Sequence, residues 1–95
     1  MKIVKEFICR EIAGEYVLVP TGDTAQEMNG MISINESAKF MWENVEKASS
    51  YEELVAMVLA EFEVEEELAR RDVAAFLNDS LKYGFIEPTK EDKTW

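Results

Sequence analysis

The sequence predicts an α+β domain in which a three-stranded antiparallel sheet is followed by three helices. Two extended apolar runs flank a turn at Gly14-Glu15, and a third, shorter run follows the turn dipeptide Asn29-Gly30. From Glu36 onward the apolar residues recur with the period of about 3.6 residues that is typical of helices. The strands therefore occupy the first third of the chain and the helices most of the remainder.

The composition indicates one folded domain. The 95 residues are 47% hydrophobic and 32% charged, which is enough for a single core. We expect the domain to span residues 1–88 and a polar tail to follow at residues 89–95. The 20 acidic and 10 basic residues give a formal charge of −10, which disfavours nucleic acid and anionic membranes and favours neutral or basic partners.

The only cysteine, Cys9, lies in a predicted strand and has no second thiol to pair with. We interpret it as a small buried hydrophobe in a reducing compartment. The N-terminus has no basic segment followed by an apolar one, and the chain has no run of roughly 18 apolar residues. A cytoplasmic protein without a membrane span is therefore expected.

The first two strands form a predicted hairpin. Phe7–Ala13 is extended, Gly14-Glu15 supplies the turn, and Tyr16–Val19 is a β-branched and aromatic run that stops at Pro20. Because Tyr16–Val19 is apolar on both faces, this strand should be central in the sheet or covered on both sides. The six residues before the hairpin show no clear pattern.

The third strand, Met31–Ile34, is the stretch on which the functional hypothesis depends. The polar segment Thr21–Glu27 is expected to be the loop that leads to it. Its side chains alternate with period two, and Asn35 is the expected N-cap of the helix that follows. If this strand lies at a sheet edge, its unpaired N–H and C=O groups form a template on which another peptide can pair.

The first two helices have regular apolar faces. The helix at Glu36–Lys47 has a stripe formed by Ala38, Met41, Trp42 and Val45. Phe40 lies off this stripe, so it is either partly exposed or in contact with a neighbouring element. The segment Ser50–Glu53 is a capping box, in which the Ser50 hydroxyl takes the Glu53 amide and the Glu53 carboxylate reaches back. The second helix starts there, and its apolar face contains Leu54, Val58 and Phe62.

The third helix, Glu66–Tyr83, ends at Gly84, a typical residue for a left-handed helix end. Its apolar residues cover roughly 180° of the helix, whereas packing on one core requires a stripe of about 100°. The surplus width indicates a partner. Either Leu77, Leu81 and Ala74 face the core while Ala69, Val73, Phe76 and Ser80 line a groove, or the reverse holds.

The residues that carry common catalytic chemistry are scarce. With no histidine and one cysteine, the chain lacks the usual zinc sites, Ser/His/Asp or Cys/His nucleophile systems and imidazole catalysis. No calcium loop or glycine-rich phosphate loop occurs, so no metal and no cofactor are predicted. The adjacent pair Arg70 and Arg71 is expected to pair with Glu66 or Glu67 one turn away. A non-enzyme is the expected class.

The sequence resembles the PqqD-like family, whose peptide-binding domains are called RiPP recognition elements. The stretches that carry the resemblance, in this order and spacing, are Arg10–Pro20, Asn29–Ala38, Trp42-Glu43 and Asp72–Leu77 with Leu81 and Gly84–Ile86. The resemblance implies a winged helix-turn-helix-like fold. It also implies an adaptor that binds the leader of a ribosomally made precursor peptide and presents it to a modifying enzyme, often a radical-SAM protein.

The resemblance further implies a site. In the family the leader adds as a strand beside the third strand, with its apolar side chains against the third helix. On this chain those positions are Gly30, Met31, Ile32, Ser33 and Ile34 on the strand and Ala69, Asp72, Val73, Phe76 and Ser80 on the helix. Neither the precursor nor its pathway, whether that of pyrroloquinoline quinone or another, follows from the resemblance.

Two other functions remain as alternatives. In a DNA-binding winged helix, the third helix would enter the major groove, but it begins with acids and its basic residues are only Arg70, Arg71 and Lys82. A leader-independent subunit that docks a protein partner fits the same composition. Only a test of binding partners separates this last alternative from the peptide adaptor.

Overall fold

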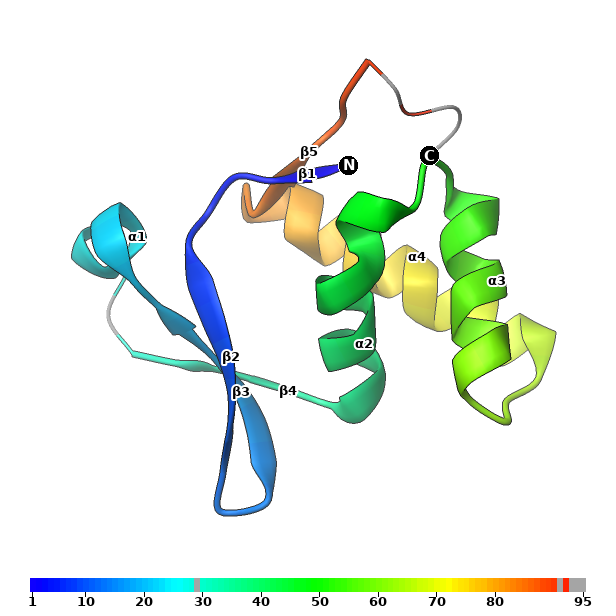
Figure 1. The fold of residues 1–95 in the computed structure, drawn as a ribbon, viewed down its shortest axis with the longest axis horizontal. Coiled ribbons are helices and arrows are strands. Elements are labelled where there is room, and N and C mark those ends of the chain that lie inside the picture. Colours follow the sequence, from blue (N-terminus) through cyan, green and yellow to red (C-terminus); the bar gives the residue numbers. More distant parts are fainter. Residues whose placement is uncertain (29, 91, 93–95) are drawn as a thin grey trace.

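A computed structural model describes residues 1–28, 30–90 and 92. Figure 1 shows a sheet beside a bundle of helices. The sheet has the order β2-β3-β4, and its strands are β2 (Phe7–Ile12), β3 (Glu15–Pro20) and β4 (Ile32–Ile34). The three main helices are α2 (Glu36–Asn44), α3 (Tyr51–Glu61) and α4 (Glu66–Lys82). The expected α+β fold, an antiparallel three-stranded sheet followed by three helices, is confirmed.

Parts of two expected features lie outside the described residues. These are Asn29, in the turn before the third strand, and residues 91 and 93–95 of the tail. Within the part of the chain that the structure describes, no helix is both long and apolar enough to cross a membrane.

The hairpin of β2 and β3 turns one residue earlier than expected. The turn residues are Ala13 and Gly14, with φ of 52° and 83°. Positive φ at both positions is typical of the type I′ turn, whose twist matches that of the flanking strands. The two strands pair antiparallel from Phe7 opposite Pro20 to Ile12 opposite Glu15.

The second strand of the hairpin is central, as its two apolar faces predicted. β3 pairs with β2 on one side and with β4 on the other. Val17 and Leu18, which point to opposite faces of β3, are 6% and 4% exposed. β4 is consequently an edge strand, as the functional hypothesis requires.

The segment expected to be a loop after the hairpin forms a short helix, α1 (Gly22–Glu27), so that prediction was wrong. Thr24 is 3% exposed, and its hydroxyl accepts a hydrogen bond from the backbone N–H of Glu6 at 2.8 Å. The N–H of Thr21 donates to the carbonyl of Glu6 at 2.9 Å. Because these bonds come from a residue distant in the sequence, local patterns do not show them.

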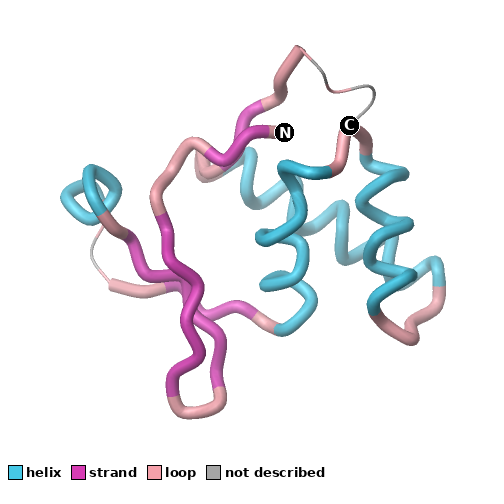
Figure 2. The backbone as a smooth tube through the Cα atoms, in the orientation of Figure 1, coloured by secondary structure: helices cyan, strands magenta, loops and turns pink. Residues whose placement is uncertain are grey.

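A second, two-stranded sheet joins the two ends of the chain. β1 (Lys2–Ile3) pairs antiparallel with β5 (Ile86–Glu87), and Figure 2 shows these short strands side by side. Met1 is 4% exposed, and its ammonium group is paired with the carboxylate of Asp92. Residues before the hairpin, which had no clear pattern, are thus held by segments from the opposite end.

The starts of α2 and α3 are capped by side chains. The Asn35 side chain accepts from the N–H of Ala38 at 2.8 Å, and the Ser50 hydroxyl accepts from the N–H of Glu53 at 3.1 Å. Both caps were expected. The reciprocal half of the capping box was not confirmed, because the Glu53 carboxylate accepts from the Ser49 hydroxyl at 2.7 Å instead. The helix expected at Glu36–Lys47 consists of two parts: α2 is followed directly by a 3₁₀ turn, η1 (Val45–Lys47).

α4 ends in a chain reversal at Gly84, as the sequence predicted. Gly84 has φ of 72°, and its N–H donates to the carbonyl of Leu81 at 3.1 Å. The next N–H, of Phe85, donates to the carbonyl of Ser80 at 2.8 Å. These two bonds form a Schellman motif, which only a residue tolerant of the left-handed conformation completes without strain.

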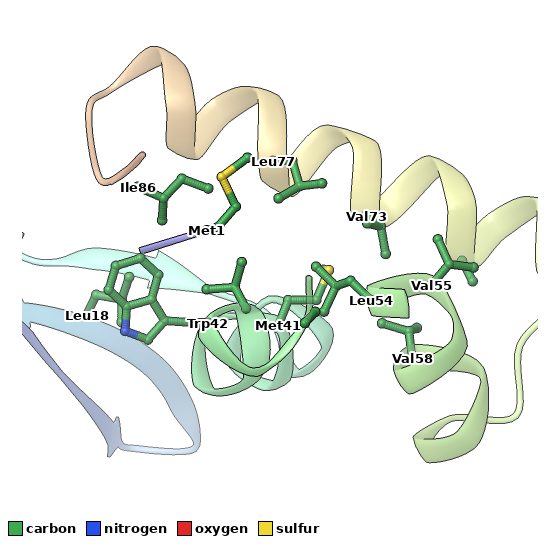
Figure 3. Packing of buried hydrophobic residues seen from close by; sticks show 13 residues of the cluster. Met1, Leu18, Met41, Trp42, Leu54, Val55, Val58, Val73, Leu77 and Ile86 are labelled. Carbon is green, nitrogen blue, oxygen red and sulfur yellow. The ribbon is translucent and has the colours of Figure 1, made fainter. Parts of the chain in front are cut away.

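The core lies where α4 crosses α2 and α3. Figure 3 shows Val73 and Leu77 of α4 directed toward Met41 of α2 and Leu54 of α3. The buried stripe of α4 consists of Ala69, Val73, Leu77 and Ser80, at spacings of three and four residues. In one of the two alternatives that the sequence left open, Leu81 faces the core beside Leu77, but it is 40% exposed. Because Ala69 and Val73 are buried together with Leu77, the structure follows neither alternative.

Phe40, which lies off the apolar stripe of α2, contacts a neighbouring element. Its ring packs edge to face against that of Phe62, just after α3, with 5.5 Å between ring centroids. This is one of the two possibilities that the sequence left open. Aromatic pairs of this geometry stabilise the junction beyond their simple burial.

Candidate functional site

A groove lies between β4 with the start of α2 on one side and the second half of α4 on the other. It encloses about 350 Å³. Its lining is mostly apolar and includes Ile32 and Ile34 from β4, Met41 and Trp42 from α2, Phe76 from α4 and Phe85 after it. Elongated apolar hollows with a few polar groups are the usual form of binding sites.

The strand beside this groove, β4, has a backbone edge that pairs with no other described strand. The pairing of the hairpin shows which N–H and C=O groups point toward this edge. In a two-residue hairpin the residues that close the turn, here Ile12 and Glu15, share both backbone hydrogen bonds. Backbone groups then alternate in direction along β3. Tyr16 and Leu18 therefore direct their N–H and C=O groups toward β4.

Ser33 is the residue of β4 whose backbone N–H and C=O groups point away from β3. Ile34 lies opposite Tyr16 and Ile32 opposite Leu18, so both isoleucines bond to β3. Ser33, between them, directs its N–H and C=O to the open edge. A second polypeptide placed along β4 would meet an unused donor and an unused acceptor at this residue.

The α4 side of the groove combines one aromatic ring with polar groups. Phe76 is half-buried and packs against the core while it lines the groove. Ser80 is 6% exposed, lines the groove, and its hydroxyl has no hydrogen-bond partner among the described residues. Asp72 and Asp79 also line the groove, and within the described part of the chain neither carboxylate has an ion pair or hydrogen bond.

Two basic side chains near the groove, Lys39 and Lys82, already have partners. Lys39 forms an ion pair with Glu43 at 2.9 Å and lies over the Tyr16 ring, 5.3 Å from its centroid. The hydrogen bond that Lys39 donates to the Glu43 carboxylate is the main cause that raises the pKa of Lys39 above its ordinary value. Lys82 lies over the ring of Tyr83, 5.6 Å from the centroid, at the end of the groove.

The structure brings six of the ten expected site residues to the groove. They are Ile32, Ser33, Ile34, Asp72, Phe76 and Ser80. Gly30 and Met31 are exposed just before β4, Met31 at 58%, and they lie outside the groove. Ala69 and Val73 are both 0% exposed. They belong to the core beneath α2 and α3, where a bound peptide has no access to them.

Several groove residues were not among those expected from the sequence. Ser37 and Ala38 come from the first turn of α2, Ala75 and Asp79 from α4, and Tyr83 directly follows α4. Asp79 had a signal, because it is seven residues after Asp72 and three after Phe76 and so shares their helix face. The α2 residues had none, since their contact with the groove depends on how α2 and α4 cross.

The fold and this groove define a class of small α+β domain with an accessible edge strand beside an apolar helix face. Residues 15–86 match the family model described as Coenzyme PQQ synthesis protein D (PqqD). The match covers most of the chain, and the protein therefore belongs to the PqqD family. No curated protein sequence matches the chain.

A solved structure has the same fold. It is described as TbiB1 in complex with the TbiA(beta) leader peptide, and it is 22% identical to this chain. The match covers 94% of this chain and 98% of that one, with a TM-score of 0.64. Nearly the whole molecule thus shares one arrangement of strands and helices with that protein.

Proposed function

We propose that this protein is a non-catalytic adaptor that binds the leader of a ribosomally made precursor peptide and presents it to a modifying enzyme. The observation that carries the proposal is the free edge of β4 beside an apolar groove. Membership of the PqqD family and the likeness to a protein bound to a leader peptide support it. The family resemblance favours a radical-SAM protein as the enzyme.

In the proposed complex the leader lies along β4 as an additional strand. Its backbone bonds to the N–H and C=O of Ser33, which supplies affinity that depends little on sequence. Alternate side chains of the leader then enter the groove against Phe76, which supplies specificity. A dissociation constant in the micromolar range, about −8 kcal/mol, is ordinary for such a small contact.

The decisive experiment removes one backbone donor. Ser33→Pro deletes the N–H at the open edge and leaves the bonds between β4 and β3 in place, because proline is tolerated on an edge strand where its nitrogen faces outward. Ser33→Ala is the matched control, since it changes the side chain and keeps the N–H. The probes are synthetic leader segments from short open reading frames beside the gene.

Binding is followed by amide chemical shifts and calorimetry. We expect shifts at Met31–Ile34 and along Asp72–Ser80, weaker binding by Ser33→Pro, and unchanged binding by Ser33→Ala. Amide dispersion of the free Ser33→Pro protein reports whether it is folded. Shifts confined to α1, or equal binding by a folded Ser33→Pro protein, would contradict strand addition at β4.

A further inference from the structure

The α4 side of the groove carries two carboxylates that form no ion pair or hydrogen bond among the described residues. Asp72 and Asp79 line the groove without a partner among the described residues, and no lysine or arginine lines it. Among the cations of α4, Arg70 is held by Glu52 and Glu66, and Lys82 lies over the ring of Tyr83. Arg71 is exposed and does not line the groove. A peptide in this groove therefore meets two free carboxylates.

The spacing of Asp72 and Asp79 along α4 is within a few ångströms of the spacing of side chains on one face of a short extended chain. Seven residues of helix separate Asp72 from Asp79, which is about 10.5 Å along the axis and about two turns. Phe76 lies between them on the same face. In an extended peptide, side chains on one face recur about every 6.6 Å, so the first and third of three such side chains are about 13 Å apart.

We propose that the groove selects leader segments in which an apolar side chain is flanked, two residues away on each side, by lysine or arginine. The apolar side chain contacts Phe76, and the two cations pair with Asp72 and Asp79. The long stems of lysine and arginine accommodate the difference of a few ångströms between the two spacings. This inference rests on the proposed function and specifies the class of peptide that the site takes.

Ser80 supplies an independent observation that a polar ligand group enters here. Its side chain is almost fully buried, lines the groove next to Asp79, and has a hydroxyl without a described hydrogen-bond partner. Buried polar groups are nearly always satisfied in proteins. A lysine or arginine that pairs with Asp79 brings N–H donors close to this hydroxyl, which can accept one of them.

The test is selection from a display library of random nine-residue peptides. Parallel selections use the wild-type protein, an Asp72→Asn/Asp79→Asn variant, and the edge-blocked Ser33→Pro variant. A Glu61→Gln/Glu63→Gln variant is the control, because it removes the same number of charges from exposed residues outside the groove. Amide dispersion confirms that each variant is folded.

We expect peptides enriched on the wild-type protein to carry lysine or arginine two residues before and after an apolar residue. This preference should persist with the Glu61→Gln/Glu63→Gln control and disappear with Asp72→Asn/Asp79→Asn. For the best peptide, each single Asp→Asn change should weaken binding about two- to fivefold, as expected of partly exposed ion pairs. Raising the salt from about 0.05 to 0.5 M should reduce this difference.

The outcomes separate the two proposals. Enrichment of apolar residues with neutral or acidic flanks overturns the charge pattern but leaves peptide binding in place. No enrichment on the wild-type protein beyond that on Ser33→Pro overturns strand addition itself, and the charge pattern with it. Enrichment of flanking cations that is equally strong with Asp72→Asn/Asp79→Asn shows that other acids attract them, which also overturns the assignment.

Discussion

Phe76 and Leu77 are neighbours in α4 whose side chains have different surroundings. Leu77 is 5% exposed and belongs to the core cluster. Phe76 is half-buried, packs on the edge of that cluster and lines the groove. A step of about 100° around the helix separates the two side chains, and it places one in the interior and the other at its surface.

Replacing these two residues should separate binding from folding. We expect Phe76→Ala to weaken leader binding by about 1 to 2 kcal/mol or more, because an aromatic anchor is lost. Its effect on the melting temperature should be small compared with that of Leu77→Ala. Thermal melts and titration calorimetry of both proteins measure the two effects.

Leu77→Ala is the matched control with the opposite pattern. It should lower the free energy of unfolding by about 2 to 5 kcal/mol through the cavity left in the core. That is a large part of the roughly 5 to 15 kcal/mol typical of a domain. A Phe76→Ala protein that unfolds, beside a stable Leu77→Ala protein that fails to bind, would contradict this assignment of the two helix faces.

At the scale of elements, α3 and α4 are joined at their N-terminal halves by one arginine. Arg70 donates two hydrogen bonds to the Glu52 carboxylate, at 2.8 and 2.9 Å, and one to Glu66 at 3.2 Å. The Tyr51 hydroxyl donates to the Arg70 carbonyl at 3.0 Å. The pairing of Arg70 with Glu66 is one of the two that the sequence predicted.

This link should depend on pH. The hydrogen bonds from Arg70 hold the pKa of the Glu52 carboxyl below its ordinary value of 4.5. A lowered pKa in the folded state means that the contribution of Glu52 to stability is present above pH 4.5 and is lost as pH falls through the lower folded value. Below that value both states are protonated and the contribution is absent.

We expect Glu52→Gln to lower the melting temperature at neutral pH, and the difference from wild type to shrink as the pH falls below 4.5 and through the lowered pKa of Glu52. Thermal melts across a pH series provide the measurement. Glu61→Gln, at the other end of α3, serves as the control because its carboxylate has no described partner. A difference for Glu52→Gln that stays constant down to the most acidic pH would show that the ion pair does not contribute.

At the scale of the whole molecule, the negative net charge opposes binding to DNA. The formal charge is −10. Non-specific binding to DNA derives its affinity from cations that displace counterions from phosphates, and excess negative charge opposes it. The described structure adds that the groove beside α4 contains two free aspartates, Asp72 and Asp79.

We therefore expect no complex with duplex DNA at physiological salt. Electrophoretic mobility shift at low micromolar protein and about 150 mM salt is the measurement. A retarded band under these conditions would favour the DNA-binding alternative over the peptide adaptor. The wild-type protein with a bound leader segment is a useful comparison. A retarded DNA band that occurs only when the peptide is present would be caused by the peptide.

The sequence by itself determined the elements whose causes are local. Extended runs on both sides of a turn placed the hairpin, and period-two alternation placed β4. The Asn35 and Ser50 side chains placed the starts of α2 and α3, and Gly84 placed the end of α4. It also placed β3 at the centre of the sheet, because its two apolar faces had to be covered. Apart from the central position of β3, each of these follows from interactions among residues close together in the chain.

Only the tertiary structure decided features that depend on distant segments. It made Ala69 and Val73 core residues and left Leu81 exposed, because the rotation of α4 is set by the helices it crosses. Bonds from Glu6 converted the expected loop into α1, and β1 formed only by pairing with β5. The groove forms where α4 and α2 cross beside β4. Periodicity shows how wide the apolar face of a helix is, but it does not show which element covers that face. The α2 residues of the groove therefore could not be predicted from the sequence.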